Sequence, residues 1–114
     1  MITFVNPLRV PSDRTEEFLR KWRVGADYVS SQPGFVASTL HRSLDSNGTH
    51  QFFTVAVWQT REDFDRAVAT PWWKSYVGDF GFSDEPDGFA AWPALCTIEA
   101  DIGGVFAHLH GEPA

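Results

Sequence analysis

Three polar side chains stand at positions where they could take part in proton chemistry: Asn6, His41 and Tyr76. Asn6 lies beside Pro7 in an otherwise apolar strand, so its carboxamide must pair with a ligand or satisfy a bulge made by Pro7, because an unpaired buried amide costs roughly 1–3 kcal/mol. Strand alternation places His41 on the same face as Phe35. His41 is either a general base, since imidazole titrates near neutral pH, or a surface residue at a strand end. Tyr76 can bind a substrate oxygen or transfer a proton.

The sequence offers few candidate metal ligands and no pair of cysteines for a disulfide. His108 and His110 have a spacing compatible with metal binding, but no third ligand accompanies them. The acidic residues near Gly88 lack the alternating pattern of a calcium loop. Cys96 is the single cysteine of the chain, which excludes an internal disulfide and fits a reducing compartment. We therefore expect a cytoplasmic protein without a metal ion or other bound cofactor.

The composition narrows the classes of partner. The 114 residues include nine Lys and Arg against 15 Asp and Glu, for a net charge of −6, which opposes binding to nucleic acid or an anionic membrane. No apolar run approaches the roughly 20 residues of a membrane span, and we expect no signal peptide. Aromatic residues make up 15% of the chain, as suits a pocket for a flat apolar molecule.

The pattern of apolar residues predicts a single domain over residues 1–114. Alternation predicts strands at 2–9, 35–42, 50–59 and 94–102, and helical spacing predicts helices from Asp13 to before Pro33 and from Thr60 to about Thr70. A short helical continuation follows Pro71. The expected N-caps of the three helical segments are Asp13, Thr60 and Thr70. The order βαββαβ is the ferredoxin-like α+β arrangement, a four-stranded antiparallel sheet with both helices on one face.

Two segments near the C-terminus do not fit regular elements. Residues 78–93 are rich in Gly and Asp and are expected to form a long loop. The loop holds four large apolar side chains that either plug the end of the subunit or cap a ligand as a lid, with Gly81 and Gly88 tolerating the backbone angles. These side chains are Phe80, Phe82, Phe89 and Trp92. Residues 103–114 are expected to form a tail.

The third strand is apolar on both faces. Two helices can cover one face of the sheet, yet Phe53, Val55 and Val57 point to the other. A second copy packed sheet to sheet would cover them and form a homodimer. The alternative is that the C-terminal tail folds over this face.

Several segments resemble the antibiotic biosynthesis monooxygenase (ABM) family over about residues 2–80. These are residues 4–7, 17–22, 32–36, 40–42 and 55–64, of which the Pro-Gly-Phe at 33–35 and the junction from Trp58 to Phe64 are the most specific. The resemblance implies a dimeric α+β barrel. The resemblance determines the fold better than the reaction. Members of the family include cofactor-free oxygenases of anthrone-type polyketides, haem-degrading enzymes, detoxifying enzymes and proteins without a known reaction.

The resemblance also suggests roles for particular residues. In the cofactor-free oxygenases the substrate loses a proton, and its anion then reacts with dioxygen in a dry aromatic pocket with donors to the oxyanion. Asn6 and Trp58 match residues of such members, whereas Thr54 replaces a frequent Asn and Phe64 replaces a Tyr of one well-known member. Thr54 retains a hydrogen-bond donor, and Phe64 has none. Tyr76 aligns with the iron-ligating His of the haem-degrading members.

These observations predict a cofactor-independent monooxygenase that acts on a planar aromatic or polyketide-type molecule between sheet and helices. The expected catalytic residues are Asn6, Thr54, Tyr76 and His41. The expected substrate-binding residues are Trp58, Phe64, Trp72, Phe52, Phe80 and Phe82. Three alternatives remain open: a polyketide cyclase or dehydratase using the same pocket, a haem-binding or haem-degrading protein, and a non-catalytic ligand-binding dimer.

Overall fold

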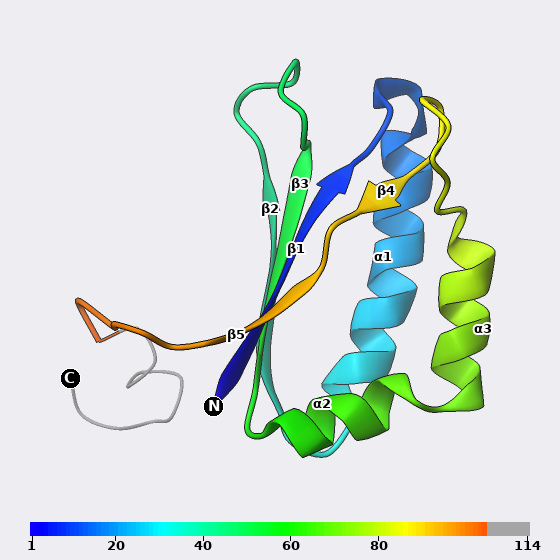
Figure 1. The fold of residues 1–114 in the computed structure, drawn as a ribbon. Helices are drawn as coiled ribbons and strands as arrows, with labels where there is room; N and C mark the ends of the chain where they lie inside the picture. The colour runs from blue at the N-terminus through cyan, green and yellow to red at the C-terminus, as the bar shows by residue number, and fades with distance from the viewer. Residues whose placement is uncertain (105–114) are drawn as a thin grey trace.

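The computed structural model describes residues 1–104 of the chain, and the predictions for His108 and His110 lie outside these residues. The predicted order of elements is confirmed (Figure 1). The strands are β1 (Ile2–Arg9), β2 (Phe35–Arg42), β3 (Phe52–Trp58), β4 (Ala90–Ala91) and β5 (Ala94–Thr97). The helices are η1 (Ser12–Arg14, a 3-10 turn), α1 (Thr15–Ser30), α2 (Arg61–Val68) and α3 (Pro71–Phe80). Within residues 1–104, no helix has the length and hydropathy needed to cross a membrane.

The sheet is antiparallel in the order β2-β3-β1-β4, and β5 also pairs with β1. The last strand begins as predicted at residue 94, and β5 pairs with residues 2–5. The structure adds β4 within the predicted loop, where it pairs with Leu8 and Arg9, and residues 92 and 93 form a break between β4 and β5. The break lies opposite Pro7, which has no N–H to offer a ladder, while its carbonyl accepts from the Trp92 N–H at 3.1 Å. The predicted start of the last strand is thus confirmed, and its predicted extension to residue 102 is wrong.

Strand alternation separates the sheet into a face covered by the helices and an open face. Asn6, Thr54 and Trp58 lie on the covered face, which is the side of the sheet toward α1 and α3 in Figure 1. Phe53, Val55 and Val57 lie on the other face, where Val57 is 4% exposed and Phe53 and Val55 are half-buried. The expected separation of the two sets of side chains is confirmed.

A bulge in β2 corrects the face predicted for one residue. Phe35 is paired with Trp58 and Ala37 with Val57, so the register shifts by one residue at Val36. Phe35 consequently packs edge-on against Trp58, with ring centroids 5.6 Å apart. After the bulge, odd-numbered residues of β2 point to the face opposite that of Phe35. His41 is paired with Phe53 and therefore lies on the open face.

Helix capping follows the prediction at two of three helices. Thr60 Oγ1 accepts from the Asp63 N–H at the start of α2, and Thr70 Oγ1 accepts from the Trp73 N–H at the start of α3. At α1, however, Asp13 lies within the 3-10 turn and is not the N-cap. At this end of α1, Glu17 instead forms ion pairs with Arg14 and Lys21. Hydrogen bonds from these two side chains lower the pKa of Glu17 to about 2.

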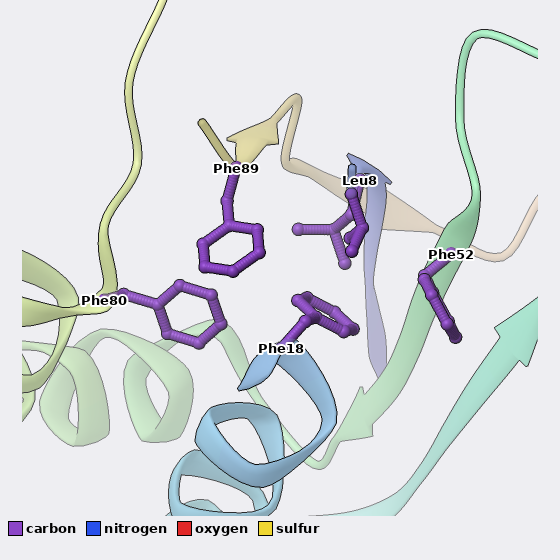
Figure 2. Packing of buried hydrophobic residues seen from close by; sticks show 6 residues of the cluster. Leu8, Phe18, Phe52, Phe80 and Phe89 are labelled. Carbon is purple, nitrogen blue, oxygen red and sulfur yellow. The ribbon is translucent and has the colours of Figure 1, made fainter. Parts of the chain in front are cut away.

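The core lies at the end of the molecule where α1 begins (Figure 2). Phe18 is fully buried, with ring centroids 4.9 Å from Phe52, 5.9 Å from Phe80 and 5.9 Å from Phe89. Leu8 and Val10 complete this buried cluster. Phe52 is therefore a core residue, and Phe80 and Phe89 plug this end of the subunit.

The segment after α3 is fastened to the body of the protein. The helix continues to Phe80 and ends at Gly81, whose φ of +102° is the left-handed conformation that suits glycine, so the loop begins later than residue 78. Arg9 donates to the carbonyls of Ser83 and Glu85, and Arg14 donates to the carbonyl of Asp87. These three hydrogen bonds fasten residues 83–87 to β1 and to the start of α1.

Candidate functional site

A pocket of about 480 Å³ lies between the covered face of the sheet and the helices α1 and α3. Its lining is almost entirely apolar. Seven of the ten predicted site residues line it: Asn6, Thr54, Trp58, Phe64, Tyr76, Phe80 and Phe82. The volume falls within the range of pockets that hold drug-sized molecules.

The polar corner of the pocket is formed by Asn6 and Thr54. These residues are directly paired across β1 and β3, so their side chains are neighbours on the same face. Thr54 is 8% exposed, and its Oγ1 accepts a hydrogen bond from Trp22 Nε1 at 3.0 Å. The Asn6 Oδ1 atom is buried and has no hydrogen-bond partner within residues 1–104. A buried acceptor without a donor favours a ligand that supplies one.

Aromatic rings form the walls beside this corner. Trp58 is 2% exposed and packs edge-on against Phe64, with ring centroids 5.9 Å apart. Phe64 in turn stacks on Phe4 at 5.5 Å. At the other end, Phe82 is 39% exposed and stacks on Phe80 at 4.6 Å. The ring faces left open to the pocket suit a flat apolar ligand.

The Tyr76 hydroxyl is already engaged. It donates to the carbonyl of Lys21 on α1 at 2.6 Å, which ties α3 to α1. Burial raises the pKa of Tyr76 to about 12, so the phenol is protonated at neutral pH and donates its hydrogen bond to α1. This geometry opposes the predicted proton-transfer role and makes Tyr76 a wall residue that holds two helices together.

The raised pKa of Tyr76 predicts a loss of stability at high pH. Folding favours the protonated phenol, so its stabilisation is complete below an unfolded pKa of about 10 and is lost as pH rises toward the folded pKa of about 12. Urea unfolding of wild type and Tyr76→Phe at pH 8 and pH 11 measures this contribution. We expect the free energy of unfolding to fall more between the two pH values in wild type, and equal falls would contradict the assignment.

Gly25 permits the close approach of Tyr76 to α1. A Cβ atom at residue 25 would lie against the Tyr76 hydroxyl and 2.6 Å from its Cζ atom. Gly25→Ala gains up to about 1 kcal/mol of helix propensity, but overpacking costs about 1–3 kcal/mol and the bond to Lys21 must also break. We therefore expect Gly25→Ala to lower the free energy of unfolding by about 1–2 kcal/mol in urea titrations.

Gly78 on α3 provides a matched control for Gly25. A Cβ atom at residue 78 would meet nothing within 4 Å. Helix propensity alone then decides whether the substitution stabilises the protein. Gly78→Ala should raise the free energy of unfolding by about 0.5–1 kcal/mol. If both variants were stabilised, the packing of Tyr76 on Gly25 would not constrain the fold.

Three predicted site residues lie outside the pocket. His41 is on the open face of the sheet, where its Nε2 atom contacts Thr39 Oγ1 at 2.8 Å. Phe52 packs into the core against Phe18. Trp72 is 44% exposed and stacks on Tyr28 with ring centroids 4.3 Å apart. The structure thus separates these three side chains from Asn6 and Thr54.

Two tryptophans of the pocket were not among the predicted site residues. Trp22 on α1 and Trp73 on α3 both line it. The signal for Trp73 was present, because adjacent helical residues point in directions about 100° apart and one of the pair 72 and 73 must face inward. Trp22 lies on the apolar stripe of α1, where spacing alone does not distinguish a core residue from a pocket residue.

The described part of the chain also bears on metal and haem binding. Within residues 1–104, no three side chains of His, Cys, Asp or Glu lie close enough together to hold a metal ion. Tyr76, which aligns with an iron ligand of haem-degrading members, directs its hydroxyl to the Lys21 carbonyl. The arrangement of this residue therefore does not favour the haem alternative.

Comparison with known proteins supports the likeness in sequence and in fold. A curated relative, the deoxynogalonate monooxygenase of Streptomyces nogalater, is 36% identical over 73 residues; the match covers 61% of this chain and spans only 57% of that protein. A candidate monooxygenase from Shewanella loihica PV-4 is 30% identical, with a TM-score of 0.72, over 88% of this chain and 95% of that chain.

Two further structures resemble this fold. SnoaB, a cofactor-independent oxygenase from Streptomyces nogalater, is 25% identical with a TM-score of 0.73, over 90% of this chain and 96% of that chain. MhuD, a heme-degrader from Mycobacterium tuberculosis, is 22% identical with a TM-score of 0.64 over 90% of this chain and all of that chain, which shows a shared fold alone. The sequence profile of the antibiotic biosynthesis monooxygenase family matches residues 1–79, and this chain belongs to that family.

Proposed function

We propose that this protein is a cofactor-independent monooxygenase that acts on a planar aromatic molecule of the polyketide type. The observation that carries the proposal is the polar corner of Asn6 and Thr54 in an otherwise apolar, aromatic-walled pocket. Similarity to SnoaB and to deoxynogalonate monooxygenase supports the same reaction class. The pocket would exclude water from the substrate and bind its reacting oxygen at one end.

The reaction oxidises a ring methylene to a carbonyl. For anthrone as the probe, loss of one proton from the methylene gives an aromatic enolate, which transfers electrons to dioxygen. One oxygen atom forms the new carbonyl, and the other leaves as water with the two hydrogens of the methylene. The carbon loses four electrons and dioxygen gains four, so the step needs no other reductant. Thr54 would donate to the enolate oxygen, and Asn6 would orient the ring beside it.

The described side chains that line the pocket offer no suitable base for the first proton of the substrate. Tyr76 is the one titratable side chain among the described lining residues, and its high pKa excludes it as a base at neutral pH. His41 lies beyond the sheet. We therefore propose that the substrate supplies its own acidity, with stabilisation of the anion by the pocket in place of a strong protein base.

Turnover of anthrone with and without dioxygen tests the proposed reaction. We expect purified protein to convert anthrone to anthraquinone faster than buffer or heat-denatured protein in air, and to stop under strict anaerobiosis. Rates unchanged without dioxygen would contradict oxygenation and favour cyclisation or dehydration in the same pocket. Absence of turnover with retained binding would favour the non-catalytic alternative.

The open face of the sheet supports a proposed homodimer. Phe53 and Val55 remain half-buried in one subunit, and Figure 1 shows all three helices on the other side of the sheet. Packing two such faces together would remove apolar surface from water and protect the sheet.

A charge on this face should therefore dissociate the dimer. We expect wild type to sediment as a dimer and Val55→Asp to sediment as a monomer, because pairing would bury two unpaired carboxylates. Leu44→Asp is the control, since Leu44 is fully exposed on the hairpin, and this variant should remain dimeric. A wild type that sediments as a monomer at micromolar concentration would contradict the proposal.

A further inference from the structure

The hydrogen bond between Trp22 and Thr54 assigns a fixed role to each group. The indole N–H can only donate, and it donates to Thr54 Oγ1 at 3.0 Å. Thr54 thus accepts from α1, and its own hydroxyl proton stays available for another acceptor. Within residues 1–104 the structure gives that proton no acceptor, although Thr54 is 8% exposed.

Asn6 presents the complementary unused group. Its Oδ1 atom is buried without a donor within the described residues, and Asn6 is paired with Thr54 across the two central strands. The corner therefore holds one free donor and one free acceptor close together. An aromatic hydroxyl matches both, because its oxygen accepts while its proton is donated. A ketone, an ether or a phenolate only accepts and leaves Asn6 Oδ1 unpaired.

We propose that Trp22 is a positioning residue that makes this pocket select a ring bearing a protonated hydroxyl. The proposal rests on the pocket of the proposed function, but it concerns binding and needs no turnover. Anthrone meets the requirement as its enol tautomer, which carries an aromatic hydroxyl and gives the same enolate when it loses a proton. The indole keeps Thr54 a donor toward the ligand. Without the indole, the Thr54 hydroxyl is free to reorient and donate to Asn6 Oδ1, which would satisfy both groups internally. The need for a hydroxyl on the ligand would then disappear.

Equilibrium dialysis with 1-naphthol and 1-methoxynaphthalene tests the proposal. The two probes share a ring system, and only the first can donate a hydrogen bond. We expect wild type to bind 1-naphthol about 3- to 10-fold more tightly, as one net hydrogen bond provides. Trp22→Phe keeps an aromatic side chain and removes the N–H, and this variant should reduce the preference to less than about 2-fold. Asn6→Leu removes the acceptor that distinguishes the two probes and should have the same effect.

Trp73→Phe is the matched control. Trp73 also lines the pocket, and no hydrogen bond of its indole N–H is found among residues 1–104. Its substitution should weaken both probes alike and leave their ratio unchanged. Thermal melting of each variant verifies folding, so a merely structural role of Trp22 would lower stability without changing the ratio.

The outcomes separate this inference from the proposed function. Equal affinities in wild type, a preference that survives Trp22→Phe, or no binding of either probe would overturn the role of Trp22. If anthrone were still oxidised, the proposed function would stand without it. A preference that behaves as expected in a protein that does not oxidise anthrone would support the role of Trp22 and contradict the oxygenase.

Discussion

Replacing Asn6 with leucine is expected to lower kcat/KM for anthrone oxidation by about 10²- to 10³-fold, because the ring would no longer be oriented with its reacting oxygen at the Thr54 donor. Leucine has a similar volume, so the change removes the carboxamide from the polar corner while it preserves the apolar wall. It also removes the buried, unpartnered Oδ1 atom, so the folded protein should lose no stability. Initial rates of anthraquinone formation measure the effect.

Asn47→Leu provides the control for this substitution. Asn47 is exposed in the hairpin between β2 and β3, so kcat/KM should change by less than about 2-fold. A wild-type rate for Asn6→Leu would show that the reacting oxygen does not bind at the corner of Asn6 and Thr54.

Replacing Phe18 with alanine should produce the largest loss of stability in the chain, about 3–5 kcal/mol. Phe18 is fully buried and contacts the rings of Phe52, Phe80 and Phe89, which come from three different segments (Figure 2). The resulting cavity would loosen the plug that closes this end of the subunit. Urea unfolding at a fixed protein concentration measures the loss.

Phe82→Ala is the matched control for Phe18→Ala. Phe82 is 39% exposed and stacks on one face of Phe80, so its truncation should cost no more than about 1–2 kcal/mol. Similar losses in both variants would mean that the cluster around Phe18 is not the centre of the core.

Local patterns predicted most of the fold because they determine side-chain direction without distant information. Alternation predicted the bounds of β1 and β2, and the hydroxyls of Thr60 and Thr70 predicted two helix starts. The exceptions depend on contacts made after folding. The last strand ends at Thr97 rather than at residue 102, and the additional strand β4 forms before it. Asp13 enters a 3-10 turn that the pair Arg14–Glu17 stabilises.

The candidate site was less predictable for the same reason. The bulge at Val36 reverses strand parity, so alternation counted from Phe35 assigned His41 to the wrong face. Trp72 was predicted to bind the substrate, but packing places Trp73 rather than Trp72 in the pocket lining. The bond from Trp22 to Thr54 joins residues 32 positions apart, and no local pattern indicates it.

Oxygenation without a cofactor is the central claim, and labelling with ¹⁸O₂ tests it most directly. Purified protein, first shown to be free of flavin and metal, would be incubated with anthrone under ¹⁸O₂ and the product analysed by mass spectrometry. We predict one ¹⁸O atom in each anthraquinone and formation well above the protein-free rate, with the excess lost in Asn6→Leu. Anthraquinone formed no faster than in buffer, or without the label, would contradict the account.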